Sequence, residues 1–391
     1  MNVYIDYHAR MDRIRKAMAD EGVDILLATR EKSVCYIGGA FVPWRSYALV
    51  ASDGRIELNT LLMDAERVRA ESWLGERIVG SGPVMPGFSL MEQAIARIES
   101  WGYADKTIGL ELGHSPRLAA GFLFATEYDM LLKGLPKARF VNALNVIDLV
   151  SAIKEPGEIA LMKRAAAICD AAQEAVKEEL RPGLTELEIA GIGELVMRQL
   201  GSEFHWPITG SNEIASGERT AYSQCGCTPP TDRILQPGDN LLVDLHSTYG
   251  HYYADLSHNY IIGEPNREQE QLAKAYEETA HLLIKKLVPG ARIGDIWQEM
   301  MEHLNSNGYA QYALAAFGHG IGIVGHEWYP AITSGEEFAH VTLEPNLTEV
   351  AALVINKPGV GGMRLECPVL ITQDGNEVLT KTPIETTIID I

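Results

Sequence analysis

The fold is decided by the stretch Pro237-Gly-Asp-Asn-Leu-Leu-Val-Asp-Leu-His-Ser-Thr-Tyr-Gly-His-Tyr-Tyr-Ala-Asp-Leu-Ser257. An apolar strand carries Asp244, a turn follows at Tyr249-Gly250, and a second strand carries Asp255. Because a hairpin places residues of its two strands opposite each other, the two carboxylates can meet on one face. Paired hard oxygen ligands are what a divalent metal site requires. The alternative is a pair of exposed carboxylates beside a turn.

Two later segments add chemistry of the same kind. The run Gly318-His319-Gly320-Ile321-Gly322 places an imidazole among glycines, which permit close approach of backbone or ligand. His326 follows seven residues after that histidine, and Glu366 lies in the mostly apolar run 363–371. A carboxylate buried in such a run is costly without a partner. Each residue alone has an ordinary explanation, as a satisfied buried histidine or an edge charge, but together they indicate one site.

In this order the residues resemble a known family, the pita-bread metallopeptidases. This group includes methionine aminopeptidase, aminopeptidase P and prolidase, with creatinase and other non-peptidase relatives. The resemblance covers essentially the whole chain. It rests on Pro230-Thr-Asp-Arg233, Pro237-Gly-Asp239, Asp244, Asp255, Gly318-His-Gly320, His326-Glu327 and Gly361–Glu366.

The resemblance implies an α+β fold with two domains. Residues 1–150 are expected to form a creatinase-like N-terminal α/β domain, and residues 151–391 a pita-bread catalytic domain with a curved, mainly antiparallel sheet backed by helices. The residue pattern agrees, because short strands and helices alternate before residue 150 and a long helix is predicted from 158 to 180. A capping box at Thr185–Glu188 opens another helix. A helical pattern also covers 116–131.

Metal ligands are implied by the same resemblance. Two-metal members of the family bind through two Asp, one His and two Glu, and four of these carry over as Asp244, Asp255, His319 and Glu366. In such sites the residues matching Asp255 and Glu366 bridge both ions. The fifth position falls on Ala352, and the nearby Glu349 belongs to the opposite strand face if the pairing is regular.

His246 is a candidate replacement ligand. It stands two residues after Asp244 on the same strand face, where typical peptidases carry a small residue. The family's DMSP lyases have an additional Asp ligand at that point. The alternative is a histidine that only occupies the strand face.

Further residues are predicted to handle the substrate. The resemblance implies a catalytic set of His319, His326 and Glu327, and it places His326 beside the developing oxyanion, as in the family. Arg45, in a segment similar to the substrate-binding segment of creatinase, is expected to anchor a carboxylate. Cys227 is nearest to the position where many members carry a substrate-contacting His. The pair Cys225-Gly-Cys227 is either a soft metal site, a nucleophile or two small thiols in a loop. The predicted substrate contacts are Arg45, Cys227, Trp328 and Tyr329.

The function that follows is metal-dependent hydrolysis of a peptide or amide C–N bond in a small carboxylate-bearing substrate, as in an Xaa-Pro peptidase. One or two divalent ions are expected, and Asp, Glu and His together suit Mn, Zn, Co or Fe. The missing fifth ligand leaves open a non-peptidase enzyme of the creatinase or DMSP-lyase type. A third reading is a binding module that has lost catalysis.

Composition narrows the partners and the compartment. The 391 residues are 46% hydrophobic and 22% charged, as in a folded globular protein, and the net charge is −20. So acidic a chain has no general electrostatic reason to bind nucleic acid or anionic membranes. Five cysteines are not a disulfide framework, and neither a signal peptide nor the roughly 18-residue apolar run of a membrane span is visible. We therefore expect a cytoplasmic protein acting on a small molecule or short peptide. The resemblance to creatinase and prolidase, which are dimers, implies a homodimer.

Overall fold

The structure, a computed structural model, describes residues 4–42, 44–82, 90–113, 121–203, 212–222, 228–327 and 329–391. The described residues divide into two compact units, an N-terminal one up to Ser151 and a C-terminal one from Ala152 onward. This confirms the predicted α+β class. None of the helices in these ranges has the length and apolar character to cross a membrane.

The N-terminal unit is built on a mixed sheet whose strands follow the order β4-β3-β2-β1-β5-β6. The apolar residues of its central strands are fully buried, which explains why they read as continuous hydrophobic runs. Of the helical pattern expected over 116–131, residues 116–120 lie outside the described residues. Gly121 has a positive φ of 93°, which does not fit a helix, and the helix α5 begins at Ala125. The strands are β1 (Ile25–Ala28), β2 (Tyr47–Ala51), β3 (Ile56–Leu61), β4 (Ile78–Ser81), β5 (Thr107–Leu110) and β6 (Arg139–Asn142), and the helices are α1 (Tyr7–Asp20), α2 (Glu31–Gly38), α3 (Leu62–Glu71), α4 (Met91–Ser100), α5 (Ala125–Gly134) and α6 (Leu144–Ala152).

The C-terminal unit begins with two helices whose first residues follow recognisable capping patterns in the sequence. Pro156 starts the first of them, and the Glu158 carboxylate accepts the backbone N–H of Glu155. The predicted capping box is present, since Thr185 and Glu188 each accept the other's backbone N–H. The helices of this unit are α7 (Pro156–Glu179), α8 (Glu186–Gln199), α9 (Arg267–Lys286), α10 (Ile293–Ser306) and α11 (Glu336–Ala339).

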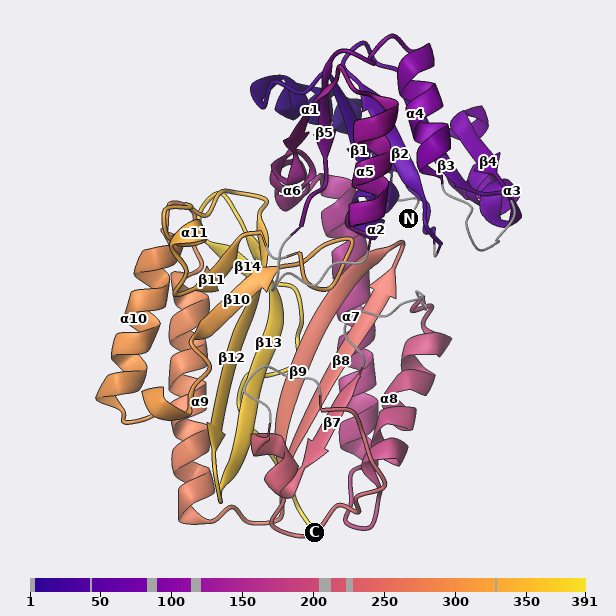
Figure 1. Ribbon diagram of the computed structural model, residues 1–391. Helices are drawn as coiled ribbons and strands as arrows, with labels where there is room; N and C mark the ends of the chain where they lie inside the picture. Colours follow the sequence, from indigo (N-terminus) through magenta and orange to yellow (C-terminus); the bar gives the residue numbers. More distant parts are fainter. Residues whose placement is uncertain are drawn as a thin grey trace. The chain divides into compact units, whose positions relative to one another are not determined.

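Two sheets lie side by side in this unit (Figure 1). One has the order β15-β9-β8-β7 and the other the antiparallel order β11-β10-β12-β13-β14. They meet where β9 runs beside β13, because the Asn259 amide pairs with both backbone groups of Arg364. The strands are β7 (Glu213–Ser216), β8 (Asn240–Tyr249), β9 (Tyr252–Ile262), β10 (Ala316–Gly320), β11 (Ala331–Thr333), β12 (Thr348–Lys357), β13 (Gly361–Ile371), β14 (Asn376–Val378) and β15 (Thr387–Ile389).

Strand alternation divides each sheet into a helix-covered face and an open face. In β12 and β13 the odd-numbered residues, such as Leu353 and Leu365, join the hydrophobic core that α9 and α10 contribute to. In β8 the Leu245 side chain packs near Gly193 of α8, and Ser247 donates to a backbone carbonyl of α7. The even-numbered residues of β8, β12 and β13 alternate with these and therefore point away from the helices.

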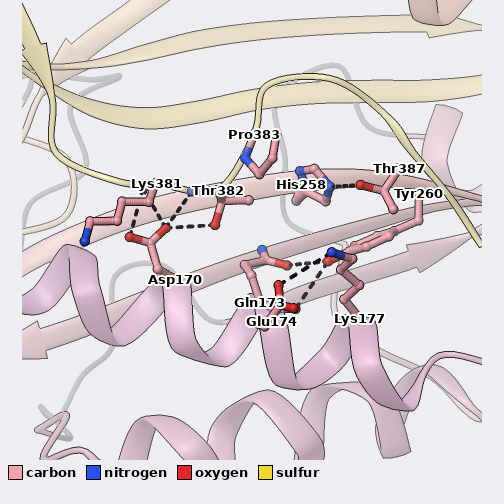
Figure 2. A pocket seen from close by; sticks show the side chains of 10 residues that line it. All are labelled: Asp170, Gln173, Glu174, Lys177, His258, Tyr260, Lys381, Thr382, Pro383 and Thr387. Carbon is pink, nitrogen blue, oxygen red and sulfur yellow. Dashed lines mark hydrogen bonds and ion pairs between the residues drawn. The ribbon is translucent and has the colours of Figure 1, made fainter.

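The C-terminal segment is fastened to α7 on the helix side. The Asp170 carboxylate accepts the backbone N–H groups of Lys381 and Thr382, each at 2.9 Å. His258 of β9 contacts Thr387 of β15 through its Nε2 atom at 2.8 Å. Between these contacts lies a small cavity of about 170 Å³, whose polar side chains pair largely with one another (Figure 2).

One carboxylate lies on the helix-covered face of β12 without a matching donor. Glu349 is fully buried, and neither of its oxygens has a hydrogen-bond partner. Nearby, on the same side, Lys154 and Glu327 form a buried ion pair with 3.0 Å between Nζ and Oε2. Burial raises the pKa of Glu349 well above its usual range, the Lys154 charge lowers it in part, and the Glu327 charge raises it further.

We predict that Glu349→Gln raises the free energy of unfolding at neutral and alkaline pH. The folded state holds the Glu349 proton more tightly than the unfolded state, so stability declines as pH rises above the ordinary carboxyl range of about 4–5. Removing the ionisable group should recover about 1–3 kcal/mol at pH 8 and little at pH 4. Urea unfolding at both pH values measures this, with Glu264→Gln at an exposed position as the control. Equal effects of the two variants would contradict it.

Candidate metal centre

The β8–β9 hairpin sets the geometry of the centre. Its two-residue turn consists of Gly250 and His251, whose φ values are 57° and 73°. Positive φ at both positions is typical of the type I′ turn that matches strand twist. The Glu203 carboxylate accepts the N–H groups of both turn residues, at 3.0 and 2.8 Å. The turn thus fixes which residues of the two strands face each other.

In this register His246 stands directly opposite Asp255, and Asp244 stands opposite Ser257. The two aspartates are therefore diagonal neighbours rather than a direct pair. Because paired residues of antiparallel strands share a face, Asp244, His246 and Asp255 all project from the open face. On the other sheet Glu366 of β13 faces Ala352 of β12 and projects from the open face as well.

The structure brings these side chains into two groups that could each hold a metal ion. One group consists of Asp244, His246, Asp255 and Glu366, and the other of Asp255, His319 and His326. Within each group, one ligand atom from every residue lies within 4.8 Å of the others. Asp255 is the member that both groups share. Glu366, whose counterpart in the resembling family bridges two ions, belongs to one group only.

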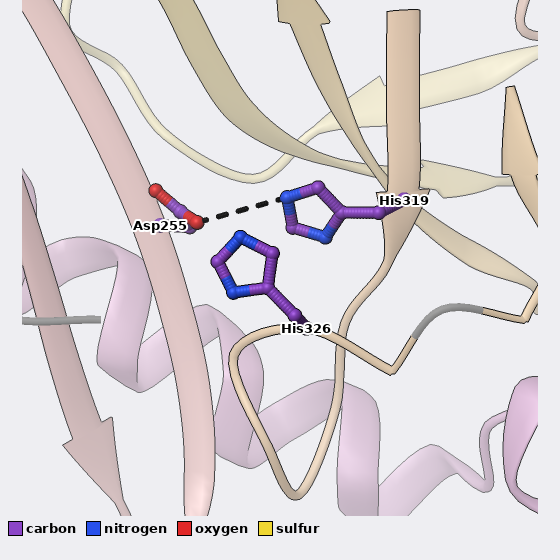
Figure 3. Close-up of side chains that lie close together, drawn as sticks. All are labelled: Asp255, His319 and His326. Atoms are coloured by element: carbon purple, nitrogen blue, oxygen red, sulfur yellow. Dashed lines mark ion pairs between the residues drawn. The ribbon is translucent and has the colours of Figure 1, made fainter. Parts of the chain in front are cut away.

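Asp255 lies between histidines from two directions. Its Oδ1 atom is 3.1 Å from Nε2 of His246, and its Oδ2 atom is 4.0 Å from Nε2 of His319. The His326 ring stacks on the His319 ring with 4.1 Å between the centroids and 22° between the planes (Figure 3). An imidazole thus approaches from β8, from β10 and from the loop after β10.

The orientation of His319 is set by its own backbone neighbourhood. Its Nδ1 atom lies 3.1 Å from the carbonyl oxygen of Gly320. A carbonyl only accepts, so Nδ1 carries the proton and the lone pair of the neutral ring is on Nε2, which faces Asp255. A second partner of this kind commonly fixes the tautomer of a metal-binding histidine.

A buried guanidinium compensates part of the negative charge. Nη1 of Arg364 lies 2.7 Å from Asp244 Oδ2 and 2.7 Å from Glu213 Oε2. Arg364 is two residues before Glu366 on β13 and shares its strand face. The Arg364 side chain connects β13 to β8 and β7, so it joins the two sheets beside the potential ligands.

Burial is the largest single influence on the pKa values of the potential ligands. It raises the pKa of Asp244 to about 6 and that of Glu366 well above its usual range, where the Asp244 and Asp255 charges add to the effect. Burial would also lower the pKa of His246, but the charges of Asp255 and Asp244 outweigh it and raise that pKa. For His326, burial and the neighbouring His319 lower the pKa to about 3, which keeps its ring neutral.

The residues present suit a divalent ion. Asp244 Oδ1, Asp255 Oδ2 and His246 Nδ1 are buried atoms without a hydrogen-bond partner. Buried polar atoms normally have partners, and a cluster of orphaned carboxylate and imidazole atoms needs an explanation. Carboxylate and imidazole donors together match Mn, Fe, Co or Zn.

Other predicted site residues lie elsewhere. The Glu327 side chain points to the helix side, where it binds Lys154 and accepts the N–H of Ile323 at 3.3 Å. The Tyr329 ring packs edge-on against Phe338 beside the core behind the sheet. Cys225, Cys227 and Trp328 fall outside the described residues.

Arg45 belongs to the N-terminal unit, and its guanidinium is engaged there. Its Nε atom donates to Glu127 Oε1 at 2.9 Å, and its Nη2 atom pairs with the other oxygen of the same carboxylate. Nη1 donates to the carbonyl of Gly121 at 2.8 Å. A substrate carboxylate at Arg45 would therefore have to compete with Glu127.

Reasoning from the sequence missed Arg364 and Glu213. The alternation of Arg364 and Glu366 along a strand could have indicated that both charges share one face. No spacing pattern leads to Glu213, which lies opposite Asp244 only through the pairing of β7 with β8. Lys154 was likewise not singled out, although it holds the residue that follows His326.

Buried carboxylates and imidazoles on the open faces of two adjoining sheets form the donor set of a divalent-metal centre. Two family descriptions match the chain, the Creatinase/Prolidase N-terminal domain over residues 10–153 and Metallopeptidase family M24 over residues 160–373. The chain belongs to metallopeptidase family M24. This confirms the predicted pita-bread family and the metal-dependent hydrolase that it implies.

Relatives match along nearly the full length. The Xaa-Pro dipeptidase of Pyrococcus horikoshii is 27% identical over 381 residues, which cover 96% of this chain and 98% of the relative. The crystal structure of the prolidase from the same organism has 26% identity and a TM-score of 0.81, with 96% and 99% of the two chains covered. The fold is also that of an Xaa-Pro dipeptidase from Bacillus anthracis, with 24% identity, a TM-score of 0.83 and coverage of 98% and 100%.

We predict that Arg364→Met destabilises the metal-free protein by about 3–5 kcal/mol, because it leaves the buried Asp244 and Glu213 carboxylates without their counter-charge. Arg364→Lys should recover part of the loss, since an ammonium group supplies the charge but not the fork. The loss should shrink at acidic pH, where the Asp244 carboxylate takes up a proton. Urea unfolding of the three proteins in a chelating buffer gives the answer. A loss below about 1 kcal/mol for Arg364→Met would show that the charge is balanced in another way.

Proposed function

We propose that this chain hydrolyses the peptide bond of small Xaa-Pro substrates with the help of one or two divalent ions. The observation that carries the proposal is the sharing of Asp255 between two groups of potential ligands, all on one open sheet face. Membership of a metallopeptidase family and similarity to proteins named Xaa-Pro dipeptidase support it.

The proposed ligands are Asp244, His246, Asp255, His319 and Glu366. A divalent ion bound by them would supply Lewis-acid polarisation of the scissile carbonyl and a more acidic water. Asp255, between His246 and His319, would orient both rings toward the ions. Arg364 would hold Asp244 in place and keep its carboxylate charged. His319 would present Nε2 because Gly320 fixes its other nitrogen. This donor set suits Mn, Zn, Co or Fe.

Arg45 is the proposed anchor for the substrate. A small substrate with a free carboxylate suits a family of peptidases that act on short peptides. For Arg45 to bind that carboxylate, its present bidentate contact with Glu127 must open. Cys227, Trp328 and Tyr329 stay proposed as substrate contacts on the resemblance alone, and Glu327 is proposed to act by holding the loop that carries His326.

One observation favours a second candidate function. Ala352 stands opposite Glu366, at the position where a carboxylate ligand was expected, and His246 adds an imidazole nearby. Such a changed donor set suits a specialised non-peptidase enzyme of the creatinase or DMSP-lyase type. A binding module without catalysis is the third outcome that an assay has to separate.

We also propose a homodimer and a cytoplasmic location. Both rest on the resemblance and the sequence. Cys169 and Cys367 are buried free thiols, which is compatible with a reducing compartment. The substrate, rather than a nucleic acid or a membrane, is the proposed partner of this acidic chain.

The test is hydrolysis of matched Xaa-Pro and Xaa-Ala dipeptides by protein freed of metal and then loaded with Mn²⁺, Co²⁺, Zn²⁺ or Fe²⁺. We expect metal-dependent cleavage that favours proline. Asp255→Asn should lose both ions and all activity, because both groups include Asp255, whereas Asp244→Asn should affect one ion. Activity without metal would point to creatinase-like chemistry. Bound ions with no activity on any amide would point to the lyase type or to a binding module.

A further prediction concerns His246. Removing its imidazole by His246→Ala should weaken Zn²⁺ binding by at least about tenfold, and Mn²⁺ binding less, because imidazole suits borderline ions better than hard ones. Competition titration with a chromophoric chelator measures both affinities. His281→Ala, an exposed histidine on α9, is the matched control. If both ions bind His246→Ala as tightly as the parent, His246 only occupies the strand face.

A further inference from the structure

The two potential metal positions differ in the number and type of their donor residues. The position at β8 and β13 has donors from Asp244, His246 and Glu366 besides the shared Asp255. The position at β10 has Asp255 and His319, and among the described residues the one further donor within range is His326. If two ions bind, the second depends on this histidine.

The sheet register explains why no carboxylate completes the second position. On β12 the residue opposite Glu366 is Ala352, whose methyl group cannot act as a ligand. The acidic residue nearest to it on that strand, Glu349, pairs with Gly320 and lies on the helix-covered face with the core residue Ala351. It therefore points away from the open face that His319 shares with Val350.

The loop after β10 holds His326 against His319. The backbone N–H of Glu327 donates to the Gly320 carbonyl at 2.8 Å, which closes the loop onto its own strand. The Glu327 side chain is anchored by Lys154 at 3.0 Å, and both charged groups are 1% exposed. With its neighbour fixed on the helix side, His326 is left on the open side, where its ring stacks on His319 (Figure 3).

We propose that His326 is a metal ligand and that Asp255, His319 and His326 form the second ion position. This extends the proposed function, on which it rests, by replacing a role for His326 at the oxyanion with a role in the first coordination sphere. One carboxylate and two imidazoles with open positions are a donor set of catalytic zinc sites. The two positions are then chemically unequal, one carboxylate-rich and one imidazole-rich, so they should differ in their preference between Mn²⁺ and Zn²⁺ or Co²⁺.

The experiment counts ions. Full-length protein is stripped with a chelator, loaded with Co²⁺, passed over a desalting column and analysed for cobalt per chain and for its visible absorption. The parent protein should hold about two ions, and His326→Ala about one, with loss of the absorption of the imidazole-rich site. His281→Ala should keep about two, because its ring lies on the exposed side of α9.

A rescue variant separates ligation from folding. Ala352→Glu places a carboxylate opposite Glu366 on the open face, so His326→Ala combined with Ala352→Glu should recover the second ion with an altered spectrum. His326→Asn provides a second removal of the imidazole if His326→Ala does not fold.

The outcomes distinguish the two proposals. If the parent binds no ion, the proposed function fails at its metal centre. If the parent binds two ions and His326→Ala or His326→Asn keeps both while kcat/KM falls, His326 contacts only the substrate and this inference is overturned. Loss of one ion in the single variant and its return in the double variant supports it.

Discussion

The open face of the C-terminal unit depends on the balance of buried charge. Carboxylates removed from water cost several kcal/mol each unless a positive charge or a metal compensates them. Here the guanidinium of Arg364 bonds to carboxylates of two neighbouring strands and its backbone is held by Asn259, so the compensation also fixes the two sheets to each other. The groups involved in the balance are Glu213, Asp244, Asp255, Glu366, His246 and Arg364.

Strand alternation accounts for what the sequence could predict. Asp244 and His246 had to share a face because they are two residues apart on a strand, and the hairpin turn placed Asp255 within reach. The same rule assigned Glu349 to the opposite face from Ala352, and the core membership of Ala351 and Leu353 agrees. Such periodic relations need only a correct strand assignment, and residue order then led to the family.

Tertiary pairing accounts for what the sequence could not predict. Glu213 lies on a strand of four residues, and only its register with β8 brings it to Asp244. The direction of Glu327 was also hidden, because the backbone path of the loop after β10 decides it. His326 and Glu327 are adjacent in sequence, yet the first contacts His319 on the open side and the second contacts Lys154 on the helix side. No pattern of residue types predicts that these two neighbouring side chains point to opposite sides.

The two-residue turn at Gly250 and His251 has a consequence for how this centre can be altered. Substitutions at the open-face positions of β8 and β9 exchange one donor for another and leave the backbone unchanged. An insertion or deletion of a single residue within the hairpin would instead slide β9 along β8 and turn Asp255 toward α7, because side chains alternate with a period of two. Point substitutions can therefore change the donors of the centre, whereas a one-residue slip of the strand pairing would remove Asp255 from the open face.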